Sequence, residues 1–209
     1  MNTQVKTIFR AATVADCPTA ARLMQIAADG VCDYIWSLQQ PEFPTLTPLE
    51  IGARCYAEGE GNFSYRHCTM AVSRNTRDEE RTQGMMMAFA IPPTSPSTTS
   101  LENKSELASL ATDVLAPYAM EQPNSWYICA LAVFPEHRGQ GIGTQLLSLA
   151  TTQARSRGLP LLSLLCFEQN VGALSLYQRH GFQVVDRAAV IPHPLIHHTG
   201  NVLLMTQHV

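Results

Sequence analysis

Two apolar runs constrain the fold of this chain more than any other feature. Residues 126–134 and 161–167 are almost continuously apolar, as in strands that are covered on both faces. Between them, apolar residues recur at helical spacing from Ile142, polar residues occupy the opposite face, and Gly158 ends the pattern. A strand–helix–strand crossover favours parallel pairing. The sequence therefore predicts an α/β fold with a parallel pair of central strands.

Shorter elements are expected on both sides of this crossover. Alternating apolar residues predict further strands at residues 5–11, 64–72, 84–91, 182–189 and 201–207. Apolar residues at helical spacing predict helices from Asp16, from Thr47, over 107–115 and over 171–180. Thr47 and Glu50 have the spacing of a capping box. The charged segment 74–81 is typical of a solvated hairpin connection, so the strands beside it should pair antiparallel.

Length and composition favour one globular domain. The chain has 209 residues and a mass of 23.0 kDa, with 45% hydrophobic and 15% charged residues. This length suits a single domain over residues 1–209, and the apolar content suffices for one core. A stretch rich in Pro, Ser and Thr, followed by a helical pattern, reads as an inserted loop and helix at about 92–124.

Charge and cysteine usage exclude several kinds of partner. A net charge of −3 and a pI near 6.1 give no reason to expect nucleic acid or an anionic membrane as a partner. No apolar stretch approaches the ~18 residues that span a bilayer, and the amino terminus has no apolar signal core. The six cysteines are dispersed without a Cys-x-x-Cys pair, so neither a metal site nor a disulfide framework is expected. We expect a cytoplasmic protein.

Residues 131–144 form the stretch that carries chemistry. A buried strand runs into a glycine-rich turn and then into a helix. Glycines let the backbone adopt positive φ and come close to a ligand, and the free N–H groups of the first helical turn attract an anion. A diphosphate is the natural ligand of such a turn.

Three interpretations of this turn stay open on spacing alone: a plain structural turn, a dinucleotide fingerprint, or a coenzyme A cradle. A fingerprint needs a third glycine where this chain has Thr144, and five residues separate Val133 from Gly139 instead of none. Glu168, at the end of the next strand, resembles the acidic residue that such a site uses for ribose. A Walker loop is excluded, because no Lys follows the glycines.

The segment 138–143, Arg-Gly-Gln-Gly-Ile-Gly, resembles the Gln/Arg-x-x-Gly-x-Gly/Ala signature of the GNAT family of N-acetyltransferases. A Leu-x-Val strand precedes it, and Asn170 with the segment 174–182 resembles the second motif of that family. The resemblance implies a mixed, mostly antiparallel sheet of about seven strands, with a parallel central pair and helices on both faces. It also implies acetyl-coenzyme A as cosubstrate.

The resemblance implies a role for each residue of the first motif. The backbone of Leu131, Ala132 and Val133 would bond the pantetheine amides. The pyrophosphate would be held by the backbone N–H groups of the turn and helix start, namely Arg138, Gly139, Gln140, Gly141, Ile142, Gly143 and Thr144. The side chain of Arg138 would add a charge-assisted contact. No metal ion is implied.

The second motif supplies the candidate for proton transfer. Asn170 and Tyr177 are seven residues apart, so they share one face of a helix. Tyr177 can donate its proton to the departing thiolate, while the alternative is a tyrosine that only packs. Asn170 either contacts the cofactor or caps its helix.

The general base is not identified by the sequence. Some relatives carry a Glu near the position of Tyr127, so that carboxylate is absent here. Residue type alone leaves a set of acceptor-side candidates, namely Asp33, Glu42, His193, His197 and His198.

The function expected from these residues is transfer of an acetyl group from acetyl-coenzyme A to a primary amine of an unidentified small molecule or protein. The alternative is a non-catalytic domain that binds acyl-coenzyme A as a sensor or scaffold. A homodimer is one assembly open to either.

Overall fold

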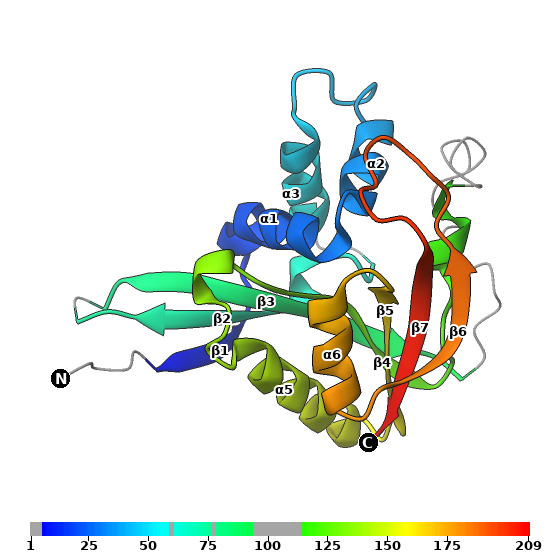
Figure 1. Ribbon diagram of the computed structural model, residues 1–209. Coiled ribbons are helices and arrows are strands. Elements are labelled where there is room, and N and C mark those ends of the chain that lie inside the picture. Colours follow the sequence, from blue (N-terminus) through cyan, green and yellow to red (C-terminus); the bar gives the residue numbers. More distant parts are fainter. Residues whose placement is uncertain (1–5, 59–60, 77, 94–113) are drawn as a thin grey trace. The chain divides into compact units, whose positions relative to one another are not determined.

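The computed structural model describes residues 6–58, 61–76, 78–93 and 114–209 (Figure 1). Seven strands form one sheet in the order β1-β2-β3-β4-β5-β7-β6. The strands are β1 (Thr7–Ala11), β2 (Cys68–Arg74), β3 (Glu80–Ile91), β4 (Ser125–Val133), β5 (Leu161–Phe167), β6 (Gln183–Ala189) and β7 (Asn201–His208). The described residues also form five α-helices: α1 (Cys17–Ala28), α2 (Val31–Leu38), α3 (Pro48–Glu58), α5 (Ile142–Ser156) and α6 (Val171–Arg179).

The sheet confirms the expected fold class. β4 and β5 pair in parallel, and α5 connects them. The pairs β1–β2, β2–β3, β5–β7 and β6–β7 are antiparallel. The predicted crossover and the mixed, mostly antiparallel sheet are therefore both observed. Within the described part of the chain, no helix combines the length and the apolar character that a membrane span requires.

The chain divides into two compact units. The first consists of Met1–Ala88 with Ala130–Ser148, and the second of Phe89–Cys129 with Leu149–Val209. The expectation of a single domain stays a prediction. Most of the expected inserted helix lies outside the described residues; of the insertion, a 3-10 helix at Ala116–Ala119 is described.

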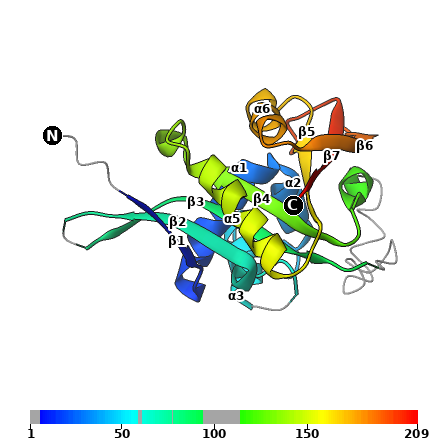
Figure 2. The ribbon, with the colours of Figure 1, turned by 90° about the horizontal axis from the view of Figure 1, so that it is seen from below.

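The first unit contains the helices of the amino-terminal half. α1 contacts both α2 and α3, and its buried residues Ala20, Ala21 and Met24 recur at the spacing of one helical face. Gly52 of α3 lies directly beneath the Trp36 ring. β1, β2 and β3 lie side by side in both views (Figures 1 and 2).

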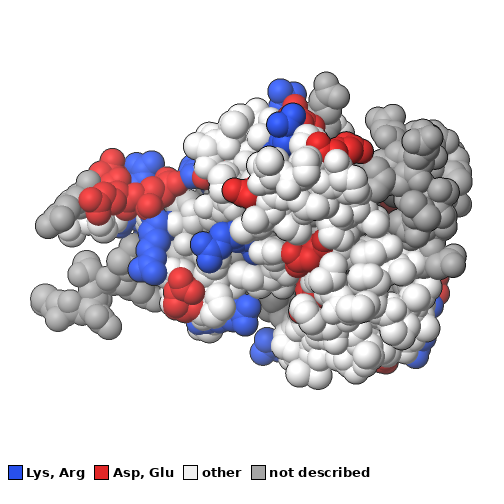
Figure 3. Space-filling model, turned by 90° about the horizontal axis from the view of Figure 1, so that it is seen from above, with Lys and Arg blue, Asp and Glu red and all other residues white. Residues whose placement is uncertain are grey.

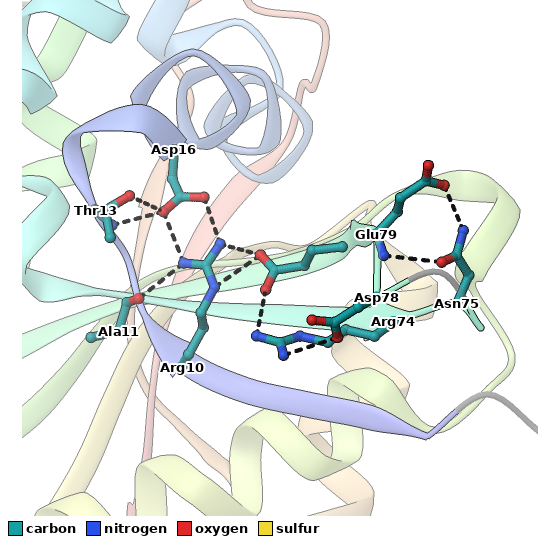
Figure 4. Close-up of polar contacts among 9 residues, drawn as sticks. Arg10, Ala11, Thr13, Asp16, Arg74, Asn75, Asp78 and Glu79 are labelled. Atoms are coloured by element: carbon teal, nitrogen blue, oxygen red, sulfur yellow. Dashed lines mark hydrogen bonds and ion pairs between the residues drawn. The ribbon is translucent and has the colours of Figure 1, made fainter.

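A charged network joins β1 to the β2–β3 hairpin. The Arg10 guanidinium donates two hydrogen bonds of 2.9 Å to the Asp16 carboxylate and also binds Glu80 (Figure 4). Arg10 holds the pKa of Asp16 well below its usual range, at about 2. Acidic and basic residues gather at the end of the hairpin, on the left of the face drawn in Figure 3.

The second unit is organised on β5. β5 pairs with β7 along its full length from Leu161 to Phe167, and β7 pairs with β6. β5 also pairs with the start of β4, where Ser125 and Ser163 share a buried hydrogen bond of 2.7 Å. The Gln169 side-chain amide donates to the Thr199 hydroxyl and accepts from the Thr199 N–H, which fastens the loop between β6 and β7 to the end of β5.

Three sequence expectations need correction. Residues 31–38 form α2, which the apolar pattern did not predict. The strand expected from Ser64 begins at Cys68, because Ser64 caps a 3-10 turn at Tyr65–His67. The segment expected as the hairpin connection is shorter, since β2 runs to Arg74 and β3 begins at Glu80.

Candidate active site

The carboxyl-terminal part of β4 forms the first wall of the candidate site. The ladder between β4 and β5 ends at the pair Ile128–Leu164, so residues 129–133 of β4 lie beyond it. Leu131 and Val133 are half-buried, whereas Ala132 between them is buried. Successive residues of a strand direct their backbone groups to opposite edges. The Phe134 N–H, directly after β4, donates to the Gln83 carbonyl of β3 at 2.9 Å, so the backbone of Leu131 and Val133 faces the edge away from β3.

The turn after β4 has the backbone geometry that glycine allows. A 3-10 turn at Pro135–His137 leads into Arg138, whose backbone is extended. Gly139 and Gly141 then adopt φ of +75° and +79°, in the left-handed region. The sequence predicted a glycine turn in which positive φ is allowed; the structure shows positive φ at Gly139 and Gly141, whereas Gly143 belongs to α5.

The start of α5 presents backbone donors. The first helical hydrogen bond runs from the Gln145 N–H to the Gly141 carbonyl at 3.0 Å, so the N–H groups of Ile142, Gly143 and Thr144 precede the helical series. The Ile142 side chain is 2% exposed, which anchors the helix start in the core. A Cβ placed on Gly139 would meet no atom within 4 Å. The turn is thus open beside Gly139.

Two polar side chains of the turn fold back onto it. The Arg138 Nε donates to the Val133 carbonyl at 3.2 Å, so the guanidinium lies over the end of β4. The Gln140 amide donates to the Glu136 carbonyl at 3.4 Å. Arg138 is exposed. The Arg138 guanidinium therefore lies beside the end of β4 and the glycine turn, the two backbone elements that the sequence assigned to the cofactor.

Asn170 and Tyr177 belong to the second unit. The Asn170 side chain accepts from the Ala173 N–H at 3.2 Å, which makes it the cap of α6, one of the two roles left open by the sequence. Tyr177 is 7% exposed and packs against Phe182 with ring centroids 5.7 Å apart. Burial and the neighbouring Cys166 raise the pKa of Tyr177 above its usual value.

The candidates for the general base are spread over both units. In the first unit, Asp33 accepts a hydrogen bond from Gln25 at 2.5 Å. In the second, the His193 Nδ1 accepts from the Leu195 N–H at 3.2 Å, and the His198 ring lies 4.5 Å from that of Phe167. These histidines share one loop, but no contact assigns a base among them.

The sequence did not predict that one polar group of the turn, on His137, would be buried. The His137 Nε2 is buried and has no hydrogen-bond partner among the described residues, a cost of about 1–3 kcal/mol. Its place in the turn was visible in the sequence, but its burial was not. Over the residues that the structure describes, no three His, Cys, Asp or Glu side chains are grouped so that they could hold a metal ion.

Comparison with known sequences points to one family. A model described as "Acetyltransferase (GNAT) family" matches residues 33–182. Mycothiol acetyltransferase from Jonesia denitrificans is 42% identical over 57 residues, which are 27% of this chain and 18% of that protein. An N-acetyltransferase from Methanocaldococcus jannaschii is 41% identical over 51 residues, 24% of this chain and 23% of that protein. The chain thus spans about a fifth of the length of these curated relatives.

Solved structures share the fold over nearly the whole chain. An N-acetyltransferase from Staphylococcus aureus Mu50 superposes with a TM-score of 0.62 at 18% identity, over 96% of this chain and 100% of that one. A polyamine N-acetyltransferase from Drosophila melanogaster gives 0.61 at 18% identity, over 98% and 100%. With the family model covering residues 33–182, the chain belongs to the GNAT family of acetyltransferases.

Proposed function

We propose that this chain transfers the acetyl group of acetyl-coenzyme A to a primary amine of a small molecule or a protein. The observation that carries the proposal is the turn between β4 and α5, where two exposed glycines of positive φ lead into a helix start. Membership of the GNAT family supports the same reaction. An amine, rather than nucleic acid or a membrane, is the partner that this reaction needs.

In the proposed binding mode, most of the contacts to acetyl-coenzyme A come from the main chain. The backbone of Leu131 and Val133 would bond the pantetheine amides as an added strand does. Ala132 lies between them on the same strand. The N–H groups from Arg138 to Thr144 would hold the pyrophosphate, with the dipole of α5 favouring its negative charge. The Arg138 guanidinium would leave the Val133 carbonyl for a phosphate oxygen, which is the stronger acceptor.

The reaction itself needs one bond formed and one broken. The nitrogen lone pair of the neutral amine attacks the thioester carbonyl and forms the C–N bond, and the C–S bond breaks with its electron pair going to sulfur. In the proposed mechanism, the Tyr177 hydroxyl gives its proton to that sulfur, the proton lost by the amine passes to solvent or to a base, and the Tyr177 phenolate regains a proton from the same source.

The raised pKa of Tyr177 is compatible with this role. It keeps the hydroxyl protonated across the physiological range, so the donor is always present. Burial likewise raises the pKa of the neighbouring Cys166 thiol, to about 12.

The test is release of coenzyme A. Purified protein is mixed with acetyl-coenzyme A and a panel of primary amines, from small polyamines and amino acids to peptides, and the free thiol is measured. We expect at least one amine to raise thiol release well above the rate with acetyl-coenzyme A alone. Tight binding of acetyl-coenzyme A without thiol release from any amine would favour the sensor or scaffold, and absence of binding would sink both.

A further inference from the structure

β3 contains one residue that has no partner on the neighbouring strand β2. The register pairs Ala71 with Gly84 and Val72 with Thr82, so Gln83 has no opposite residue on β2. One extra residue between two paired positions is a β-bulge, which bends its strand and redirects side chains. Gln83 is only 4% exposed, so this bulge places an uncharged polar side chain inside the first unit.

The polar groups of Gln83 join two different strands. Its side-chain Oε1 accepts from the Thr7 hydroxyl of β1 at 2.9 Å. Its backbone carbonyl accepts from the Phe134 N–H at 2.9 Å. Phe134 is the residue directly after β4, and it begins the turn that leads to the two left-handed glycines. The bulge therefore connects β1 to the first residue of the candidate cofactor turn.

Gly84, the next residue, lets β3 lie unusually close to β4. A Cβ on Gly84 would lie 2.6 Å from the Ala132 carbonyl oxygen and 3.2 Å from the Val133 Cα. Both of these neighbours are backbone atoms, so no side-chain rotation can make room. Any side chain at this position must push the end of β4 away.

These contacts fix the edge of β4 that the cofactor would use. The Ala132 carbonyl and the Phe134 N–H face β3, so the backbone of Leu131 and Val133 faces the opposite edge. We propose that Gln83 and Gly84 are positioning residues for coenzyme binding, because they set the depth and direction at which β4 presents this edge. The proposal rests on the proposed function, since it assigns the edge to the pantetheine chain.

The first test compares two glycine substitutions in the first unit. Gly84→Ala introduces the clash with β4, and Gly52→Ala introduces a clash with the Trp36 ring in the helical layer. Both should lower Tm. We expect Gly84→Ala to raise the Kd for acetyl-coenzyme A about tenfold or more, and Gly52→Ala to leave it within about twofold. Equal affinity in folded Gly84→Ala and wild type would overturn the proposal, as would an equal loss in both variants.

The second test changes no residue of β3 or β4, so it tests the positioning role of Gln83 even if Gly84→Ala does not fold. Thr7→Val keeps the shape of the side chain but removes the hydroxyl that binds Gln83, and Thr7→Ser restores a hydroxyl. We expect Thr7→Val to raise KM for acetyl-coenzyme A several-fold with kcat little changed, and Thr7→Ser to recover most of the loss. A fall in Tm with unchanged KM would make Gln83 a merely structural residue. Failure of wild type itself to bind acetyl-coenzyme A would instead contradict the proposed function.

Discussion

Tyr177 carries the chemical step of the proposed reaction at the scale of one residue. Its burial has two consequences: the pKa of the hydroxyl is raised, and the ring packs against Phe182. A substitution that removes only the hydroxyl can separate these roles. The ring contact survives in phenylalanine, whereas the proton donor does not.

We predict that Tyr177→Phe keeps the affinity for acetyl-coenzyme A and lowers kcat by about 10²–10⁴-fold, the usual contribution of a general acid. The measurement is steady-state kinetics with an amine found in the panel. Tyr34→Phe, at another buried tyrosine, is the control and should leave kcat unchanged. A loss below about threefold in Tyr177→Phe would make Tyr177 a packing residue.

Asp16 gives a prediction about pH. Its pKa is lowered to about 2 by Arg10, while the unfolded chain has a value near ~3.9. A lowered pKa stabilises the fold above the unfolded value, and that stability is lost as pH falls from about 4 through about 2. After allowance for solvent screening of the partly exposed arginine, we expect a contribution of about 1 kcal/mol.

The test is Asp16→Asn, followed by denaturant unfolding between pH 2 and pH 7. The variant should be less stable than wild type by about 1 kcal/mol at pH 6, and the difference should shrink below pH 4. Arg54→Ala removes an exposed ion pair with Glu58 and serves as control, with little effect at any pH. A constant difference between Asp16→Asn and wild type across the range would show that the hydrogen-bond geometry, and not the charge, stabilises this corner.

At the scale of the element, the glycines of the turn after β4 and of the start of α5 differ in backbone conformation. Gly141 has φ of +79°, so a side chain strains the backbone there. Gly143 lies inside α5, where alanine is the better helix former by about 1 kcal/mol. The helical backbone of Gly143 does not itself require glycine, whereas a ligand that approaches the first turn of α5 closely would.

We therefore predict opposite effects on stability and the same effect on binding. Gly141→Ala should lower the stability by about 1–2 kcal/mol, and Gly143→Ala should leave it unchanged or raise it. Both should weaken acetyl-coenzyme A binding, measured by calorimetry. Undiminished affinity in Gly143→Ala would place the diphosphate away from the first turn of α5.

The sequence predicted the elements that carry local signals. The capping box at Thr47 is observed, with the Glu50 carboxylate accepting from the Thr47 N–H at 2.8 Å. α2 was missed because its start has no such signal: it follows Asp29 and Gly30, both in left-handed conformations, and Gly30 offers no capping side chain. Tertiary contacts, including Trp36 against Tyr56, stabilise it instead.

The candidate site was predictable to the same degree. The glycine turn and the cap by Asn170 follow from residue spacing, because both depend on neighbours in the chain. The bulge at Gln83 does not, since it depends on Thr7 and Phe134, which are distant in sequence. The base is not predictable either, because its choice depends on where an acceptor lies.

At the scale of the whole molecule, the open matter is whether the two compact units unfold together. β3, β4 and α5 each contribute residues to both units, and the family model covers parts of both. A long strand that belongs to two units cannot melt in one of them without losing hydrogen bonds at the boundary. Cooperative unfolding is therefore the expected behaviour.

The last prediction is that calorimetry shows one transition, with calorimetric and van't Hoff enthalpies in agreement. Acetyl-coenzyme A at about 100 times its Kd stabilises the native state by ~2.7 kcal/mol, which corresponds to a rise in Tm of about 5–10 °C for a chain of this size. NAD and ATP at the same concentration are controls and should leave Tm unchanged. Two transitions, of which acetyl-coenzyme A moves only one, would refute the single domain and show that the units fold independently. A rise in Tm with NAD alone would instead assign the glycine turn to a dinucleotide, because only a ligand that binds the native state can raise its melting temperature.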